Sequence, residues 1–136
     1  MARILGIDYG SKKTGISTTD PLQIIVNGIG TVPTLGLFDF IVNYCETEDV
    51  EKIVIGRPTH KDGKDTYLVP QILAFKNRLQ KKMPDMLFDF ADETLSSVQA
   101  RSIILQSGVR KSKRRDKSLV DKVSAVIILQ RYLNHI

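Results

Sequence analysis

Carboxylates are the side chains of this sequence with the clearest chemical potential. Asp8 ends a short apolar run that starts at residue 3, and the adjacent pair Asp92 and Glu93 follows a second strand-like segment. Asp121 lies at the start of an apolar, helix-like stretch near the C-terminus. Carboxylates held close together repel one another unless a cation neutralises them, and Mg²⁺ takes carboxylates, water and substrate phosphate as ligands. Two such ions about 4 Å apart can stabilise the attacking and the leaving oxygen in phosphodiester hydrolysis.

Each of these acids also has an ordinary structural explanation. Asp is common in turns, so Asp8 can simply open the turn that follows it. Asp121 can form a capping box with Ser118 or interact favourably with the helix dipole. Asp92 and Glu93 can be solvated loop residues. The residues alone therefore leave the metal site as one interpretation among others, and they do not separate Asp92 from Glu93.

Strand-like and helix-like stretches must bring these acids together. Three β-rich segments joined by short links predict an antiparallel meander at residues 3–8, 14–19 and 23–32. After them the hydrophobic period alternates between helix and strand, so the later strands should run parallel to the first. The sequence therefore predicts an α/β fold, a mixed five-stranded sheet with helices on its faces. In such sheets functional residues gather where the parallel strands end.

The later elements are predicted from their periods and end signals. Thr34 is expected to cap the first helix. The apolar positions of that helix are Leu35, Phe38, Ile41, Val42 and Cys45. The remaining elements are a strand at 52–56, a helix at 67–82 with Pro70 in its first turn, a strand at 86–91, a helix between Ser96 and Gly108, and a helix at 119–134 capped by Ser118.

A single basic run at residues 110–117 carries the whole net charge. Its six bases and one acid give +5, which equals the +5 of the entire chain. Such a run attracts phosphate backbones through counterion release and adds affinity without reading the bases. A solvated loop is the ordinary alternative, and the two interpretations are compatible. The basic residues are Arg110, Lys111, Lys113, Arg114, Arg115 and Lys117.

A second place for an anion is the turn after Asp8. Gly10 and Gly15 allow the backbone to approach a phosphate, and Lys12 and Lys13 supply positive charge. Glycine-rich patterns by themselves are weak signals. The two lysines are therefore candidate nucleic-acid contacts beside the first acid.

Length and composition indicate one soluble domain over residues 1–136, with 42% hydrophobic and 26% charged residues. No apolar run approaches the ~20 residues of a membrane span, and the N-terminus lacks a signal-peptide pattern, so we expect a cytoplasmic protein. Cys45 is the only cysteine, which excludes an internal disulfide. Its place on the apolar side of a helix predicts a small buried residue.

Four motifs occur in an order that identifies a family resemblance. Residues 4–16 are similar to a Gly-Ile-Asp-x-Gly-x-Lys-Arg-x-Gly opening, and residues 54–63 to Val-x-Gly-x-Pro followed by Asp-Gly. Residues 92–100 look like Asp-Glu-Arg-Leu-Thr-Thr-x-x-Ala, and residues 121–130 resemble Asp-x-x-Ala-Ala-x-x-Ile-Leu-Gln. Over nearly its whole length, the sequence resembles the YqgF/RuvX family of pre-16S rRNA processing nucleases, relatives of the RuvC-type Holliday junction resolvases.

The resemblance implies an RNase H-like nuclease domain with a three-acid site at Asp8, Glu93 and Asp121. It separates Glu93 from Asp92. Asp8 would bridge two Mg²⁺ or Mn²⁺ ions, with Glu93 on one and Asp121 on the other, and the substrate would complete their coordination. The implied substrate is pre-16S rRNA, cut at its 5′ end during ribosome biogenesis, so RNA is favoured over DNA and a pre-ribosomal particle is an expected partner.

The sequence departs from the family pattern at three places. Thr94 replaces an Arg, Ser124 replaces an Ala, and residues 59–61 read Thr-His-Lys instead of Lys-Asn-Met. The first change removes an expected phosphate or carboxylate contact. The third puts substrate contacts in that loop in doubt. None of the three acids is lost.

Three other functions compete with rRNA processing. A Holliday junction-type DNA endonuclease would use the same site and would act as a two-fold dimer, although the sequence does not give the oligomeric state. A non-catalytic RNA-binding ribosome-assembly factor would not need the intact acids. ATPases of the actin and sugar-kinase superfamily share the Gly-Ile-Asp-x-Gly opening but need two lobes, and 136 residues supply one.

Overall fold

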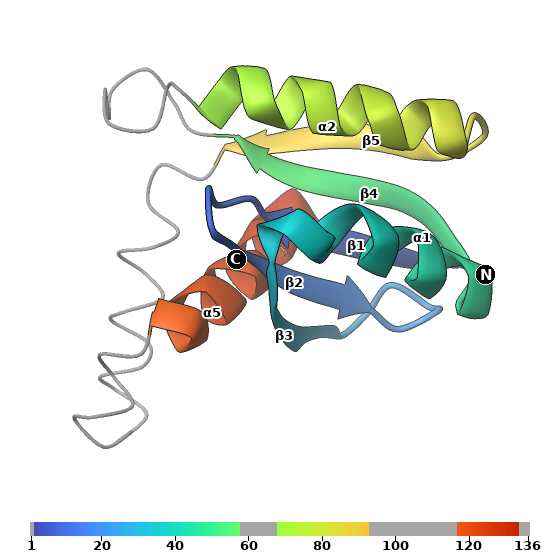
Figure 1. Cartoon of the computed structure of the whole chain (residues 1–136). Coiled ribbons are helices and arrows are strands. Elements are labelled where there is room, and N and C mark those ends of the chain that lie inside the picture. Colours follow the sequence, from blue (N-terminus) through green and yellow to red (C-terminus); the bar gives the residue numbers. More distant parts are fainter. Residues whose placement is uncertain (1, 58–67, 93–116, 134–136) are drawn as a thin grey trace.

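The computed structural model describes residues 2–57, 68–92 and 117–133 of the chain (Figure 1). Within them the elements follow the order of strands and helices expected from the sequence. They are β1 Arg3–Asp8, β2 Lys13–Thr19, β3 Val26–Pro33, the 3₁₀ turn η1 Thr34–Gly36, α1 Leu37–Thr47, β4 Val50–Arg57, α2 Leu68–Lys82, β5 Leu87–Asp92 and α5 Lys117–Tyr132. The helix expected between Ser96 and Gly108 lies outside the described residues.

The five strands form one mixed sheet in the order β3-β2-β1-β4-β5. β1 pairs antiparallel with β2, and β2 pairs antiparallel with β3, so the predicted meander is confirmed. β4 runs parallel to both β1 and β5. β1 is therefore the central strand, and the carboxyl ends of β1, β4 and β5 lie at the same edge of the sheet.

Helices cover both faces of this sheet. Figure 1 shows α1 on one face and α5 on the other, with α2 lying along β4 and β5. Alternate residues of β1 point to opposite faces, as a strand requires. Leu5 and Ile7 lie in the larger core with α1 and α2, whereas Ile4 packs with Val54 and Leu129 under α5. Full burial of each such aliphatic side chain contributes roughly 1.5–3 kcal/mol.

α5 lies unusually close to the sheet because the residues beneath it are small. Gly6, Ser17 and Gly28 form a row across β1, β2 and β3, since Ser17 is in register with both glycines. A Cβ on Gly6 would lie 2.5 Å from Leu129 Cγ and 2.5 Å from Ser17 Oγ. The buried Ser17 hydroxyl donates a 2.7 Å hydrogen bond to the Ala125 carbonyl of the helix. These contacts fix both the distance of α5 from the sheet and its position across the strands.

The start of the first helix differs from the prediction. The chain first makes the 3₁₀ turn at Thr34–Gly36, which has three residues per turn and therefore shifts the helical face. Leu35, expected on the apolar face, is fully exposed, whereas Leu37 and Ile41 are buried. The prediction that Thr34 caps the helix is also wrong. Its hydroxyl donates to the carbonyl of Gly10 in another segment of the chain.

Two other element boundaries move. β3 starts at Val26 because the Asp20 carboxylate accepts backbone hydrogen bonds from Ile24 and Ile25, at 2.7 and 2.8 Å, and shapes the preceding loop. These bonds lower the pKa of Asp20. The last helix begins at Lys117, so Ser118 lies inside its first turn and does not precede it. The second helix and the position of Pro70 in its first turn agree with the prediction.

Cys45 is half-buried, so the expectation of a small buried residue is met in part. Burial raises the pKa of its thiol to about 11, so the thiol is protonated at neutral pH. None of the described helices is both long enough and apolar enough to cross a membrane.

Ser124 is the place where the packing of α5 can be improved. Its buried hydroxyl has no hydrogen-bond partner in the part of the chain that the structure describes. An unpaired buried hydroxyl costs on the order of 1–3 kcal/mol, and Ala is the better helix former. We therefore expect Ser124→Ala to raise the free energy of unfolding by about 1 kcal/mol, measured by urea denaturation.

Ser17→Ala is the matched comparison for this prediction. It removes a hydroxyl that does have a partner, the carbonyl of Ala125, so it should lower the free energy of unfolding. If both substitutions shift the urea midpoint in the same direction, the presence of a hydrogen-bond partner does not decide the sign of the effect, and the prediction is wrong.

Candidate active site

Asp8 is the one of the three expected acids whose side-chain burial the structure describes. It is the last residue of the central strand β1, and it is half-buried. Its Cα partner on β2 is Gly15. The backbone of Asp8 is positioned by the pairing of β1 with β2, and the preceding residue Ile7 also pairs with β4. Strand pairing therefore fixes the backbone of Asp8, and the turn that follows bears on the direction of its carboxylate.

The second expected acid follows the strand at the sheet edge. Ile7, Ile55 and Phe90 lie in register across β1, β4 and β5. β5 ends at Asp92, two strands from β1, which corresponds to roughly 10 Å across the sheet. Glu93 is the next residue in the sequence and lies outside the described residues. The backbone up to Asp92 thus leads toward the edge where Asp8 lies.

The third expected acid belongs to α5. Asp121 is one turn before Ala125, which receives the hydrogen bond from Ser17 of β2. Its neighbour Lys122 lies beside Gly28 of β3, so this part of the helix is over the meander. The backbone of Asp121 therefore lies on the side of β1 that is opposite to β5. The position of its side chain is outside what the structure describes.

The described residues alone do not form a complete metal site. Among residues 2–57, 68–92 and 117–133, no three His, Cys, Asp or Glu side chains come together. Asp8 supplies one hard oxygen donor in a fixed position, and the two expected partners are also carboxylates. This donor set matches the preference of Mg²⁺ and Mn²⁺ for oxygen ligands. The donors that are present therefore fit a hard divalent cation.

The turn between β1 and β2 carries the two candidate lysines. Lys12 and Lys13 are exposed beside the end of β1, as the phosphate-contact prediction requires. The turn depends on Gly10, because a Cβ there would lie 2.2 Å from the Lys13 carbonyl oxygen. Of the basic run, Lys117 begins α5, and residues 110–115 lie outside the described residues.

Comparison with known proteins decides the family. The RuvX family model, described as Holliday junction resolvase, matches residues 2–135, almost the entire chain. The chain belongs to the RuvX family. It is 49% identical to a protein of Phocaeicola vulgatus, over 98% of this chain and 96% of the relative. It is 46% identical to a protein of Porphyromonas gingivalis, over 99% of this chain and 98% of the relative.

Both relatives carry the name "Putative pre-16S rRNA nuclease". Among solved structures, this RuvX chain resembles RuvC of T. thermophilus, solved in complex with a Holliday junction substrate. The TM-score is 0.57 at 13% sequence identity, over 99% of this chain and 96% of the other. At that identity the likeness shows the fold alone, and it confirms the predicted RNase H-like sheet. The family is one of nucleases, which hydrolyse phosphodiester bonds.

Two contacts of α2 with aromatic rings, one of them to the residue after Asp8, were not predicted from the sequence alone. The ring of Tyr9, the residue after Asp8, packs on Phe75 with 5.6 Å between ring centroids. Burial raises the pKa of Tyr9, and the charge of Arg78 opposes part of that effect. The Arg78 guanidinium in turn lies 4.7 Å from the ring centroid of Phe38. The only local signal was the aromatic residue inside the Gly-Ile-Asp-x-Gly motif.

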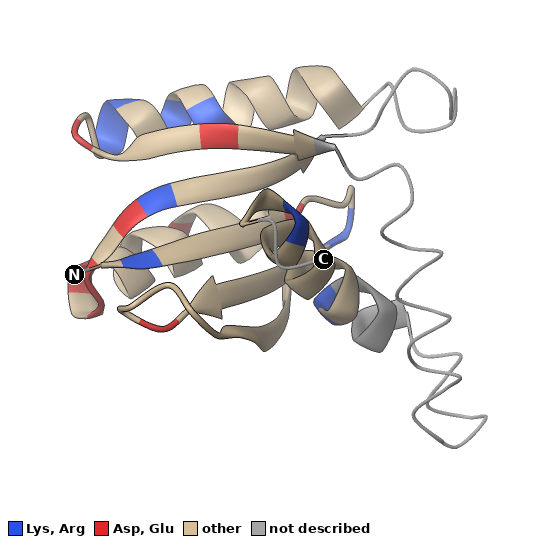
Figure 2. Ribbon diagram, turned by 180° about the vertical axis from the view of Figure 1, so that it is seen from behind, with Lys and Arg blue, Asp and Glu red and all other residues tan. Residues whose placement is uncertain are grey.

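α2 also contributes charge. Figure 2 shows basic positions and no acidic position along this helix. Its basic residues are Lys76, Arg78, Lys81 and Lys82. Two of them lie in the last turn, where positive charge interacts favourably with the helix dipole, and this explains them without a ligand.

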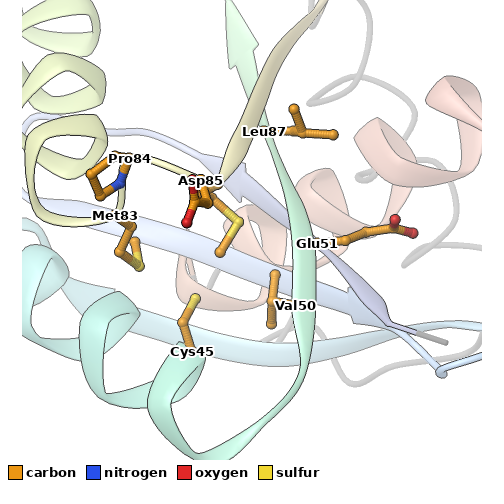
Figure 3. Close-up of a pocket in the computed structure, with 8 residues that line it drawn as sticks. Cys45, Val50, Glu51, Met83, Pro84, Asp85 and Leu87 are labelled. Atoms are coloured by element: carbon orange, nitrogen blue, oxygen red, sulfur yellow. The ribbon is translucent and has the colours of Figure 1, made fainter.

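A pocket of about 440 Å³ lies away from the acids (Figure 3). Its lining includes Val50 and Leu87, the first residues of β4 and β5, so it opens at the edge opposite to Asp8. Cys45, Met83 and Met86 add sulfur to its wall, which also carries the acids Glu51 and Asp85 (Figure 3). Its place at the amino ends of the strands separates it from the candidate active site.

A short hydrogen-bond chain connects the last helix to β4 and β5 in this RuvX protein. Tyr132, at the end of α5, donates a 2.7 Å bond to Asp89 of β5 and accepts a 2.8 Å bond from Lys52 of β4. The Tyr132 bond, followed by that from the Phe90 backbone, lowers the pKa of Asp89. These hydrogen bonds join the helix that carries Asp121 to the strand that precedes Glu93 in the sequence.

The hydrogen bonds of Tyr132 lead to a prediction about stability and pH. Tyr132→Phe removes both bonds and should lower the free energy of unfolding at pH 7 by less than about 1 kcal/mol, because the site is exposed. The pKa of Asp89 is lower in the folded protein, so its contribution is complete above its ordinary value near ~3.9 and is lost as the pH falls below that. The difference in free energy of unfolding between wild type and variant, measured by urea denaturation, should therefore be smaller at pH 3 than at pH 6.

Tyr44→Phe is the control for this measurement. Tyr44 bonds weakly to the Thr18 hydroxyl, at 3.4 Å, and touches no carboxylate there. The change in free energy of unfolding caused by Tyr44→Phe should be the same at pH 6 and at pH 3. A Tyr132→Phe effect that does not change with pH would rule out the Asp89 carboxylate as the partner that matters.

Proposed function

We propose that this RuvX protein is a metal-dependent nuclease that processes the 5′ end of pre-16S rRNA during ribosome biogenesis. The observation that supports this most directly is sequence identity of 46–49% to relatives named "Putative pre-16S rRNA nuclease", over nearly the full length of both chains. A ribosomal substrate would place the protein in the cytoplasm, and a single nuclease domain over residues 1–136 would suffice for the reaction.

We assign the metal-binding role to Asp8, Glu93 and Asp121. The support for Asp8 is its half-buried position at the end of the central strand. The support for the other two is their place in the family motifs. Glu93 follows Asp92, the last residue of β5, in the sequence, and Asp121 belongs to α5. Two bound Mg²⁺ or Mn²⁺ ions, completed by substrate phosphate, would activate a water molecule and stabilise the leaving oxygen.

The remaining contributions come from basic side chains. Lys12 and Lys13 extend from the turn beside Asp8 and would neutralise a phosphate next to the scissile bond. The run at residues 110–117 would hold the RNA backbone without reading its bases. Positioning and charge neutralisation are therefore the work of the protein, and base specificity would have to come from RNA shape or from the pre-ribosomal particle.

Junction-type DNA cleavage is the second candidate, because the matching family is described as Holliday junction resolvase. The same acids would serve both reactions, so only the substrate distinguishes them. An RNA-binding assembly factor without catalysis is the third candidate. It would bind RNA and show no metal-dependent cleavage.

Asp8→Asn tests the nuclease assignment. The variant keeps the size of the side chain but removes the charge, so metal-dependent cleavage should fall on the order of a hundredfold or more. The measurement uses a labelled pre-16S 5′-leader fragment, single-stranded RNA and a four-way DNA junction, each with Mg²⁺ and with Mn²⁺. Asp85→Asn is the matched control, because Asp85 is an exposed acid beside the pocket at the opposite edge.

Each outcome of this assay favours one candidate. Cleavage of the leader fragment that is lost only in Asp8→Asn supports rRNA processing. Cleavage of the junction alone supports the resolvase. Binding without cleavage under either metal contradicts the nuclease proposal for the isolated protein and favours the assembly factor, and repeating the assay with the pre-ribosomal particle as substrate checks that conclusion.

The basic run gives a separate prediction about salt. Changing both Arg114 and Arg115 to Gln removes two expected phosphate contacts, so the slope of log affinity against log salt should decrease by about 1.4 for single-stranded RNA. The measurement is a binding titration at several salt concentrations. Changing Lys81 and Lys82 to Gln is the control, since it removes the same net charge from the end of α2. Equal changes in slope for the two double variants would refute a specific role of the run.

A further inference from the structure

The turn that follows Asp8 is held by two threonine side chains. Gly10 lies two residues after Asp8, and both of its backbone polar groups face hydroxyls from other parts of the chain. The Gly10 carbonyl accepts a 2.7 Å bond from the hydroxyl of Thr34. The Gly10 N–H donates a longer, 3.5 Å bond to the hydroxyl of Thr14.

The two hydroxyls close a ring. Thr14 Oγ1 and Thr34 Oγ1 are 2.9 Å apart. A hydroxyl has one proton, and that of Thr34 is used on the Gly10 carbonyl, so Thr14 must be the donor between the two threonines. The bonds therefore run from the Gly10 N–H to Thr14, from Thr14 to Thr34, and from Thr34 back to the Gly10 carbonyl. Hydrogen bonds arranged in such a chain polarise one another and strengthen as a group.

The ring joins the turn and the start of β2 to Thr34, which lies 20 residues beyond Thr14 in the sequence. Thr14 belongs to β2 and is completely buried, whereas Thr34 is half-buried at the junction between β3 and α1. The backbone N–H of Thr34 also donates a 2.9 Å bond to the carbonyl of Lys12. Thr34 therefore contacts the turn at two points, one on each side of its tip.

The geometry of the turn makes this attachment matter for the acid. Gly10 already approaches the Lys13 carbonyl so closely that no side chain would fit, which leaves the turn little freedom of its own. The ring restrains the remaining freedom, which is rotation about the φ and ψ bonds of Gly10, because it holds the two peptide groups on either side of the Gly10 Cα. Asp8 precedes Gly10 in the chain, and Lys12 and Lys13 follow it.

We propose that Thr14 and Thr34 are positioning residues for the active site. The hydroxyl ring fixes the backbone conformation at Gly10 and so sets the direction of the Asp8 carboxylate and its separation from Lys12 and Lys13. This role rests on the proposed metal-dependent nuclease function. Both hydroxyls are used within the ring, so both threonines act through the backbone of the turn.

Thr34→Val tests the ring at its most connected member. Valine has nearly the same shape as threonine, so the packing remains and the hydroxyl is lost. Outer groups that orient a metal ligand typically affect metal affinity or activity by about 10–100-fold. We expect Mn²⁺ affinity of the RNA-free protein, measured by calorimetry, to weaken by about tenfold, and kcat on the leader fragment to fall by about 10–100-fold with a smaller change in KM.

Three further variants make the test specific. Thr34→Ser keeps the hydroxyl and should restore most of the Mn²⁺ affinity and of kcat. Thr14→Val breaks the ring at its other member and should reproduce the loss, which keeps the test valid if Thr34→Val fails to fold. Thr47→Val removes a threonine hydroxyl that bonds to helix carbonyls at the far end of α1, and it should leave both quantities unchanged.

Hydrogen exchange of the Gly10 amide and thermal unfolding complete the experiment. The positioning role requires faster Gly10 exchange in Thr34→Val while the protein remains folded. If wild type cleaves RNA and Thr34→Val has the same kcat and Mn²⁺ affinity, the positioning role is wrong and the nuclease function stands. If wild type neither binds Mn²⁺ nor cleaves, the nuclease proposal fails and the positioning role fails with it.

Discussion

The architecture depends on close contact between one helix and three strands. Gly6 and Gly28 place no side chain between the sheet and α5, and the small side chain of Ser17 donates its hydroxyl to the helix carbonyl of Ala125. Close approach of this kind gives dense packing but tolerates almost no change in volume. The helix that carries Asp121 is therefore fixed relative to β1, the strand that ends with Asp8.

The candidate active site is arranged by the backbone more than by contacts between its own side chains. Asp8 is held by strand pairing, and the turn after it is held by the threonine ring. The chain from Lys52 through Tyr132 to Asp89 adds a second connection between α5 and the parallel strands. Like charges brought together repel, so a rigid frame is needed before a cation arrives.

Much of the fold follows from sequence periodicity, because strand alternation and helical spacing are local. The meander, the parallel strands and the position of Asp8 could all be predicted in this way. The bond between Ser17 and Ala125 and the contact of Thr34 with Gly10 could not, since they join residues that are distant in the sequence. The 3₁₀ turn before α1 was missed because Leu35 fits a helical period equally well. Selecting Glu93 over Asp92 required the family motif.

The order in which the chain is synthesised gives the last helix another significance. Its contacts with Ile4 and Val54 join α5 to the first and fourth strands, so this packing cannot form until residues 117–133 have been synthesised. Contacts between segments so far apart in the chain form late in folding. A product truncated before residue 117 exposes an apolar sheet face and lacks Asp121. Such a fragment is expected to be prone to aggregation.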